Sequence, residues 1–208
     1  MLGRRGLRVG RPDPSLRAVI AMRRLLLLRH APTAATRRAA FSADEPLDER
    51  GAAAAAALRG RFRSTGESYA SPADRARETA RLAGLDAEVE PALAECDFGA
   101  WAGHRLDELA ASDPDGVRRW LDDPAARPHG GETMVELMSR VAGWLDGQAA
   151  REGAAVAVTH GGPIRAAVLH ALGAPAEAFW RVDAAPLSLT ELHADAGRWR
   201  VVRLNASP

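Results

Sequence analysis

A run of four leucines, Leu25 to Leu28, constrains the fold of this chain more than any other stretch. It ends at Arg29-His30-Ala31-Pro32, so a proline turn follows it directly. A short continuous apolar run of this kind is typical of a strand buried on both faces. The alternative is a buried helical turn, but the run is short for a helix and Pro32 disfavours helical geometry at Ala31. We therefore predict a buried strand that carries Arg29 and His30 at its carboxyl end, where ligands bind in open α/β sheets.

Strand and helix signals alternate along the rest of the chain. Further strands are expected at residues 67–70, 87–90, 154–159, 187–192 and 199–204, and helices after Leu47, after Ser71, and at 106–111, 117–121, 132–152 and 163–172. Ser71 is the expected N-cap of its helix, with Pro72 at the first helical position. The last two strands are expected to form a hairpin. This order predicts an α/β fold, a three-layer α/β/α sandwich whose sheet is mostly parallel with an antiparallel edge.

The length of 208 residues suits a single domain. Residues 1–22 are rich in Arg, Gly and Pro and show no periodicity, so we expect either a disordered tail or a true start at Met22. Residues 23–208 would then form the domain. Within it, the proline-punctuated segment 91–130 is expected to be an insertion that lies over the pocket like a lid.

Composition excludes several classes of function. The formal net charge of +1 argues against a dedicated nucleic-acid surface, although every basic residue is an arginine. The single cysteine, Cys96, allows no intramolecular disulfide and suits a reducing cytoplasm. We expect it to be a small buried hydrophobic residue rather than a reactive thiol. No apolar run approaches the roughly 18 residues of a membrane span, so we expect no membrane association.

Three further segments add to the Arg29-His30 pair. They are Ser71–Ala80 (SPADRARETA), Leu93–Gly103 (LAECDFGAWAG) and Val156–Gly162 (VAVTHGG). In this order they resemble the histidine phosphatase superfamily, which includes cofactor-dependent phosphoglycerate mutase. The resemblance covers roughly residues 23–204. It implies a phosphoglycerate mutase-like fold and phosphoryl transfer through a phosphohistidine.

Phosphoryl transfer needs an in-line nucleophile, positive charge around the equatorial oxygens and a proton for the leaving oxygen. The resemblance implies that His30 is the nucleophile, with one ring nitrogen attacking while the other donates to a fixed acceptor. Arg29 and Arg75 are the expected forks for the phosphoryl oxygens. Arg77 and Arg81 are alternatives on the same helix, and we expect both at the surface.

A second histidine and a carboxylate complete the expected catalytic set. The resemblance implies that His160 hydrogen-bonds the transferring phosphoryl group, and the adjacent Gly161 lets the backbone approach a ligand closely. Glu95 is implied as the general acid that protonates the leaving oxygen and later activates water. Asp97 is the competing carboxylate.

The chain departs from the family pattern at two positions. Ala31 stands where the family most often has Gly, and Thr36 stands where many members have Asn; the Thr36 hydroxyl can still donate to a phosphate oxygen. Residues 130–133 resemble the family's Gly-Gly-Glu-Ser turn, where we expect Glu132 at a helix start rather than in catalysis. Four large apolar residues are expected in the core, with an aromatic-recognising pocket as the alternative: Phe98, Trp101, Trp120 and Met134.

These patterns favour a metal-independent phosphomonoesterase that needs no cofactor and acts on a small phosphorylated metabolite. The residues in these motifs most resemble those of the α-ribazole phosphatase and broad-specificity branch of the family. This resemblance makes α-ribazole 5'-phosphate a candidate substrate. The alternative within the family is a phosphoglycerate mutase, which must keep water from the phosphohistidine. The short insertion, the absence of Lys and an end soon after the last strand favour hydrolysis.

Two other classes remain open. A metallohydrolase could use His30 and His160 as ligands, but the two are far apart in sequence and the neighbouring arginines would repel a cation. A non-catalytic phosphate-binding protein could use the same fold. A homodimer formed through a sheet edge is compatible with the sequence.

Overall fold

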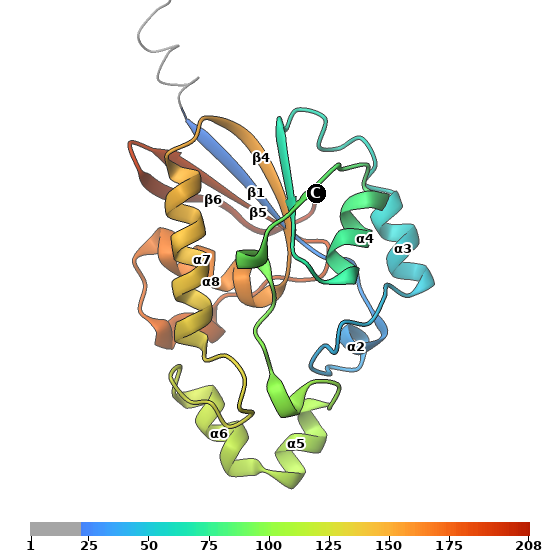
Figure 1. The fold of residues 1–208 in the computed structure, drawn as a ribbon, viewed down its shortest axis with the longest axis vertical. Helices are drawn as coiled ribbons and strands as arrows, with labels where there is room; N and C mark the ends of the chain where they lie inside the picture. The colour runs from blue at the N-terminus through green and yellow to red at the C-terminus, as the bar shows by residue number, and fades with distance from the viewer. Residues whose placement is uncertain (1–21) are drawn as a thin grey trace, which may run out of the picture.

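The computed structural model describes residues 22–208, and a six-stranded sheet of order β3-β2-β4-β1-β5-β6 is its centre (Figure 1). The strands are β1 (Arg23–Arg29), β2 (Glu67–Ala70), β3 (Glu88–Val89), β4 (Gly153–Thr159), β5 (Leu189–Asp195) and β6 (Arg198–Ala206). The pairs β3–β2, β2–β4 and β4–β1 are parallel, and the pairs β1–β5 and β5–β6 are antiparallel. The structure confirms the predicted sheet. The prediction for the N-terminal tail concerns residues 1–22, which, apart from Met22, lie outside the described residues.

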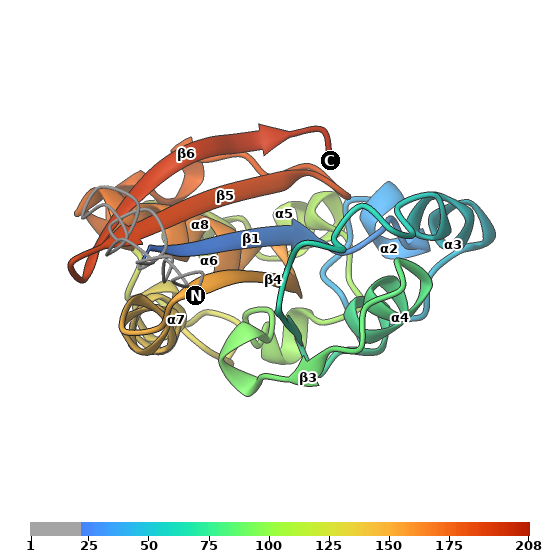
Figure 2. The ribbon, with the colours of Figure 1, turned by 90° about the horizontal axis from the view of Figure 1, so that it is seen from above.

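The four leucines of β1 alternate between two hydrophobic clusters, one on each face of the sheet. Leu25 and Leu27 pack in the cluster that includes α7 (Met134–Ala149) and α8 (Gly161–Leu172). Leu26 and Leu28 pack in the cluster on the face of α3 (Glu49–Ala56) and α4 (Asp74–Leu82). Figure 2 shows these helix pairs on opposite sides of the sheet. The three-layer sandwich is therefore confirmed, and each buried leucine contributes roughly 2 kcal/mol relative to exposure.

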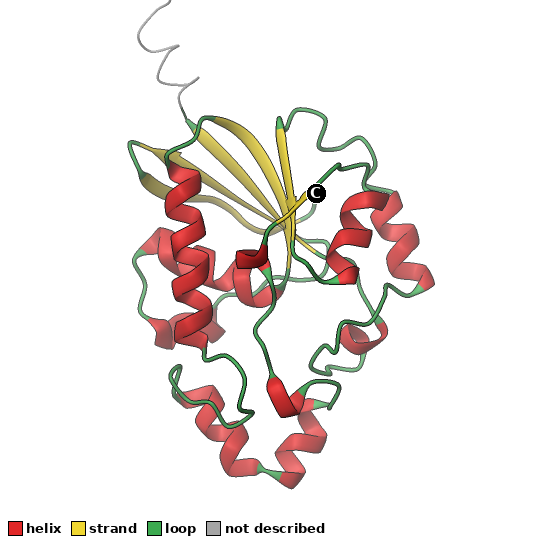
Figure 3. Ribbon diagram, viewed as in Figure 1, coloured by secondary structure: helices red, strands yellow, loops and turns green. Residues whose placement is uncertain are grey.

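The remaining helical elements are short. They are α2 (Ala34–Arg37), α5 (Leu106–Ser112), α6 (Pro114–Asp122) and the 3₁₀ turns Pro91–Leu93, Gly99–Trp101 and Ala176–Arg181. The α5–α6 pair lies apart from the sheet, at the bottom of Figure 3. Among residues 22–208, no helix has the length and apolar character needed to cross a membrane.

The helices α3 and α4 begin in different ways. Asp48 caps α3, because its carboxylate accepts a hydrogen bond from Gly51 N. Ser71 does not cap α4, which begins at Asp74 with no side-chain cap. The Ser71 hydroxyl accepts a hydrogen bond from Ala73 N at 3.3 Å, just before the helix, and lies 2.6 Å from His160 Nε2. A buried imidazole without a partner would be costly, and the Ser71 hydroxyl supplies that partner.

Candidate active site

A cavity of about 210 Å³ lies at the carboxyl end of β1. One part of its lining, which we call the polar floor, consists of Arg29, His30, Arg75, Glu95 and Gly162. A second part, which we call the aromatic wall, consists of Phe41, Phe98, Trp120, Met134, Phe179 and Trp180, and further residues line the cavity between the two. The cavity therefore joins a set of charged and titratable groups to an apolar surface.

His30 follows β1 directly and is only 4% exposed. Its Nδ1 lies 2.7 Å from Ala31 O, which can only accept, so Nδ1 carries the proton and Nε2 carries a lone pair. Burial, followed by the charge of Arg75, lowers the pKa of His30 to about 3. The imidazole is therefore neutral at physiological pH, as a nucleophile must be.

Arg29 and Arg75 place guanidinium groups beside this imidazole. Arg29 Nη1 donates to Ala184 O at 2.5 Å, and burial lowers the pKa of Arg29. Arg75 Nη1 donates to Asp44 at 3.3 Å. The Nε atoms of both arginines are buried and have no hydrogen-bond partner within the described part of the chain. Both arginines also line the cavity, where the charge of their guanidinium groups favours binding of an anion.

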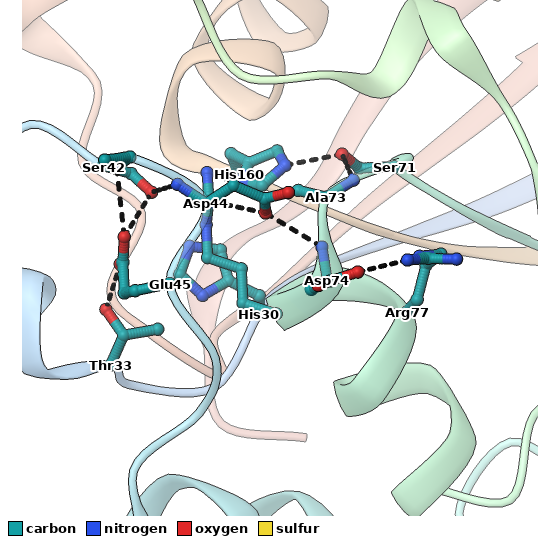
Figure 4. Close-up of polar contacts among 12 residues, drawn as sticks. His30, Thr33, Ser42, Asp44, Glu45, Ser71, Ala73, Asp74, Arg77 and His160 are labelled. Carbon is teal, nitrogen blue, oxygen red and sulfur yellow. Dashed lines mark hydrogen bonds and ion pairs between the residues drawn. The ribbon is translucent and has the colours of Figure 1, made fainter. Parts of the chain in front are cut away.

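His160 lies behind Arg75 and is fully buried. A guanidinium can only donate, so His160 Nδ1 accepts from Arg75 Nη2 at 3.1 Å. His160 Nε2 must then carry the proton, which it donates to Ser71 Oγ (Figure 4). Burial, followed by the proximity of His30, lowers the pKa of His160 well below its ordinary value. Both histidines are therefore neutral, with ring centroids 5.0 Å apart.

Glu95 brings a carboxylate to the floor. Its two oxygens accept from Cys96 N at 3.0 Å and Gly162 N at 3.3 Å. A Cβ at Gly162 would lie 2.1 Å from Glu95 Oε1, so a larger residue at this position would displace the carboxylate. The competing Asp97 is exposed, bonds to Gly99 N and does not line the cavity. The structure therefore places Glu95, not Asp97, in the lining of the cavity that His30 also lines.

The loop after β1 closes one side of the floor. Glu45 accepts from Thr33 Oγ1 at 2.7 Å and from Ser42 Oγ at 2.9 Å (Figure 4). Burial opposes ionisation of Glu45, but these hydrogen bonds outweigh it and lower the pKa. Thr36 also lines the cavity, and its hydroxyl lies 3.0 Å from that of Thr33. Its role as a phosphate ligand remains a prediction.

Some sequence expectations place residues correctly and others need correction. Arg77 and Arg81 are exposed, as expected. Gly162, rather than Gly161, lines the cavity. Glu132 lies just before the helix cap Thr133 and does not line the cavity, so it precedes the helix rather than starting it.

The expectations for Cys96 and the large apolar residues have mixed outcomes. Cys96 is buried, and burial raises its pKa, so it is not a reactive thiolate. Trp101 is buried and absent from the cavity lining. Trp120 and Met134 belong to the core cluster, Phe98 packs against it, and all three also line the cavity, because they lie where the core meets it.

Sequence reasoning missed several residues around the cavity. Ser71 emerged only as a helix cap, and Glu45 lies in a loop that has no periodicity to mark it. Arg165, one turn into α8, lines the cavity, with Nε donating to Val182 O at 2.8 Å and Cζ 5.3 Å from the Trp180 ring centroid. The sequence feature that could have identified Arg165 is its position about one helical turn after the His160 segment.

The family model for the histidine phosphatase superfamily (branch 1) matches residues 25–207. A bifunctional protein of Mycobacterium tuberculosis is 37% identical over 185 residues, which cover 83% of this chain and 51% of that protein. The chain thus spans about half the length of this relative. Phosphoserine phosphatase 1 of Hydrogenobacter thermophilus is 30% identical over 144 residues, covering 66% of this chain and 68% of that protein.

Solved structures with similar folds are also named phosphatases. A mycobacterial glucosyl-3-phosphoglycerate phosphatase in complex with VO3 has a TM-score of 0.77 and 30% identity, over 89% of this chain and 100% of that chain. A putative α-ribazole-5'-P phosphatase from Escherichia coli has a TM-score of 0.79 and 26% identity, over 89% of this chain and 98% of that chain. These neighbours share the fold and carry different substrate names.

Proposed function

This chain belongs to the histidine phosphatase superfamily, and on that premise we propose that it is a phosphomonoesterase that works through a phosphohistidine intermediate. The observation that carries the proposal is the state of His30, which is neutral and bonded through Nδ1, with Nε2 unprotonated. Two guanidinium groups, on Arg29 and Arg75, line the same cavity as His30. A nucleophile between anion-binding donors suits attack on a phosphate ester.

In the proposed reaction, the guanidinium groups of Arg29 and Arg75 bind the phosphoryl oxygens. His30 Nε2 forms a bond to phosphorus as the ester P–O bond breaks, and Glu95 gives its proton to the leaving oxygen. A water then attacks phosphorus, the N–P bond breaks, and Glu95 takes the proton of that water. The products are an alcohol and phosphate. His160 is still proposed as a phosphoryl ligand, and this role requires its Nε2–H to leave Ser71 Oγ, because both ring nitrogens are bonded in this structure.

The proposed substrate is a small phosphorylated metabolite, with α-ribazole 5'-phosphate as one candidate. Two observations support this candidate: the name of the Escherichia coli neighbour, and an aromatic wall on which a flat ring could pack. We also propose that the segment 91–130 covers the cavity as a lid, since it supplies Glu95, Phe98 and Trp120 to the lining.

The first experiment is hydrolysis of p-nitrophenyl phosphate with EDTA present, comparing the wild type with His30→Ala. We expect wild-type activity to survive EDTA and the variant to be inactive. Loss of wild-type activity in EDTA would contradict the metal-independent route, and full activity of His30→Ala would contradict the phosphohistidine. A panel of α-ribazole 5'-phosphate, phosphoserine and 3-phosphoglycerate then compares substrates. Isomerisation of 3-phosphoglycerate instead of phosphate release would favour the mutase alternative.

A further inference from the structure

Arg140 on α7 is bound to two separate segments of the chain. Its Nε and Nη2 lie 2.6 and 2.9 Å from the two carboxylate oxygens of Glu132, which is a bidentate ion pair. Its Nη1 donates to Ala92 O at 2.7 Å. Its Nη2 also donates to Ala94 O at 2.8 Å and Glu95 O at 3.1 Å. One side chain therefore binds three backbone carbonyls in the turn that leads to Glu95.

Glu132 is bound to the same strip of chain through its backbone. Glu132 N donates to Asp97 O at 2.7 Å, and Cys96 Sγ donates to Glu132 O at 3.2 Å. The side chain of Glu132, through Arg140, holds the residues before Glu95, and its backbone holds the residues after it. The Glu95 position is thus fixed from both sides.

The pair is partly buried, with 24% of the Arg140 side chain and 17% of the Glu132 side chain exposed. Neither residue lines the cavity. Arg is suited to this position because its planar fork can bind a carboxylate bidentately while its other N–H groups reach carbonyls, which the point charge of Lys cannot do. Removing either partner would leave charged or polar groups unpaired at a partly buried site.

We propose that Glu132 and Arg140 form a positioning clamp that aligns Glu95 with the leaving oxygen of the substrate. The Glu95 carboxylate is held only by the backbone amides of Cys96 and Gly162 among the described residues. No side chain orients it, so the position of its own backbone decides where the carboxylate lies. The inference rests on the proposed function, because the clamp matters through the proton that Glu95 supplies.

The kinetic test compares kcat/KM for two substrates that differ in how much they need an acid. An alkyl phosphate leaves as a strongly basic alkoxide and needs a proton, whereas p-nitrophenolate leaves readily without one. For Arg140→Met we expect a loss of about 100-fold on the alkyl phosphate and of less than about 5-fold on p-nitrophenyl phosphate. Glu95→Gln should show the same selectivity, and Arg140→Lys should fall between Arg140→Met and wild type.

Arg127→Met is the matched control. Arg127 pairs with Glu136 at the start of the same helix, but that pair is about half exposed and contacts no part of the Glu95 turn. Its ratio of the two kcat/KM values should equal the wild-type ratio. Equal losses on both substrates in Arg140→Met, or no loss on either, would overturn the clamp.

Amide hydrogen exchange on the free protein gives a readout that does not depend on activity. In Arg140→Met we expect the amides of Cys96 and Gly162 to exchange at least about 10-fold faster, with the amide of Val158 in β4 unchanged. Faster exchange throughout β4 would show a general structural role and overturn the proposal, as would unchanged exchange at Cys96. If the wild type hydrolyses neither ester, the proposed function fails, and the exchange data still decide whether the clamp holds the Glu95 turn.

Discussion

The polar floor and the aromatic wall line one cavity but are built in different ways. In the floor, Arg29 and His30 come from the end of β1, and His160, from the end of the adjacent β4, packs behind them. In the wall, Phe41 comes from a loop, Trp120 from α6 and Trp180 from a 3₁₀ turn. The nucleophile side of the floor is therefore held by the sheet, whereas the wall is held by contacts among its own side chains.

The register of the sheet explains the geometry of the floor. Arg29 of β1 pairs with Thr159 of β4, so the next residues, His30 and His160, stand side by side. Their ring separation of 5.0 Å is close to the spacing of about 4.8 Å between neighbouring strands. No strand pairing fixes the spacing of the wall. There the Trp120 ring packs against the rings of Phe41 and Trp180, at centroid distances of 5.4 and 4.5 Å. We infer that the floor sets the reaction and the wall sets which leaving group fits.

The largest effect should come from His30→Ala. Removing the nucleophile should lower kcat by at least about 10⁴-fold for every phosphate ester, whatever its leaving group. Steady-state assays on p-nitrophenyl phosphate and an alkyl phosphate would measure this. If His30→Ala lost activity on only one of the two esters, the idea that the floor carries the reaction and the wall selects the leaving group would be wrong.

Arg75→Met should be the next largest. It removes a cation next to the phosphoryl group and the donor to His160 Nδ1, so we expect kcat/KM to fall roughly 10²- to 10³-fold for all substrates. Inhibition by vanadate should weaken in parallel. Unchanged vanadate affinity would show that Arg75 does not bind the phosphoryl group.

The floor should also make stability depend on pH. The folded-state pKa of His30, about 3, lies below the ordinary value of 6.5, so between these values the unfolded chain binds the proton and the folded chain does not. Stability is therefore full above about pH 6.5 and falls as the pH decreases towards 3. From pH 7 to 5 the loss should be roughly 2 kcal/mol from His30 alone. Urea unfolding of wild type and His30→Gln measures it; equal pH slopes would contradict the assignment.

Alanine substitutions at the adjacent residues Gly161 and Gly162 should have smaller effects on activity, and the two effects should differ. A Cβ on Gly162 would collide with Glu95 Oε1, whereas a Cβ on Gly161 would meet the Arg29 and Arg165 guanidinium groups at 3.6 Å, an ordinary contact. Gly162→Ala should displace the acid and lower kcat/KM on an alkyl phosphate roughly 10- to 30-fold. Gly161→Ala should cost less than about 3-fold by the same assay. The reverse order would mean that Gly161, as first expected, is the closer to the ligand.

The smallest effect should come from Trp180→Ala in the wall. Trp180 is 36% exposed, so its removal should cost little stability. We expect KM to change by up to about 10-fold, more for a bulky ring-bearing ester than for a small one, with kcat nearly constant. A uniform fall in kcat across substrates would assign Trp180 to the reaction rather than to selection.

The sequence predicts the floor far better than the wall, for a physical reason. The leucine run marks β1, and residues at the carboxyl ends of neighbouring parallel strands must converge, so His30 and His160 can be paired from the sequence and the family motifs. Phe41 and Phe179 carry no local pattern that shows their meeting, because they come together only through tertiary packing. Ser71 failed as a cap prediction because a long-range partner, His160, competes with the local rule.

The placement of the two histidines on paired central strands has a consequence for heating. The ends of β1 and β4 cannot separate without breaking the middle of the sheet, so His30 should keep its place until the whole molecule unfolds, and esters whose leaving group needs no proton should still react. The wall depends on loops and short helices that can open earlier. A warmed sample should therefore discriminate poorly between esters while it still hydrolyses them, and its substrate preference should decline at a lower temperature than its turnover.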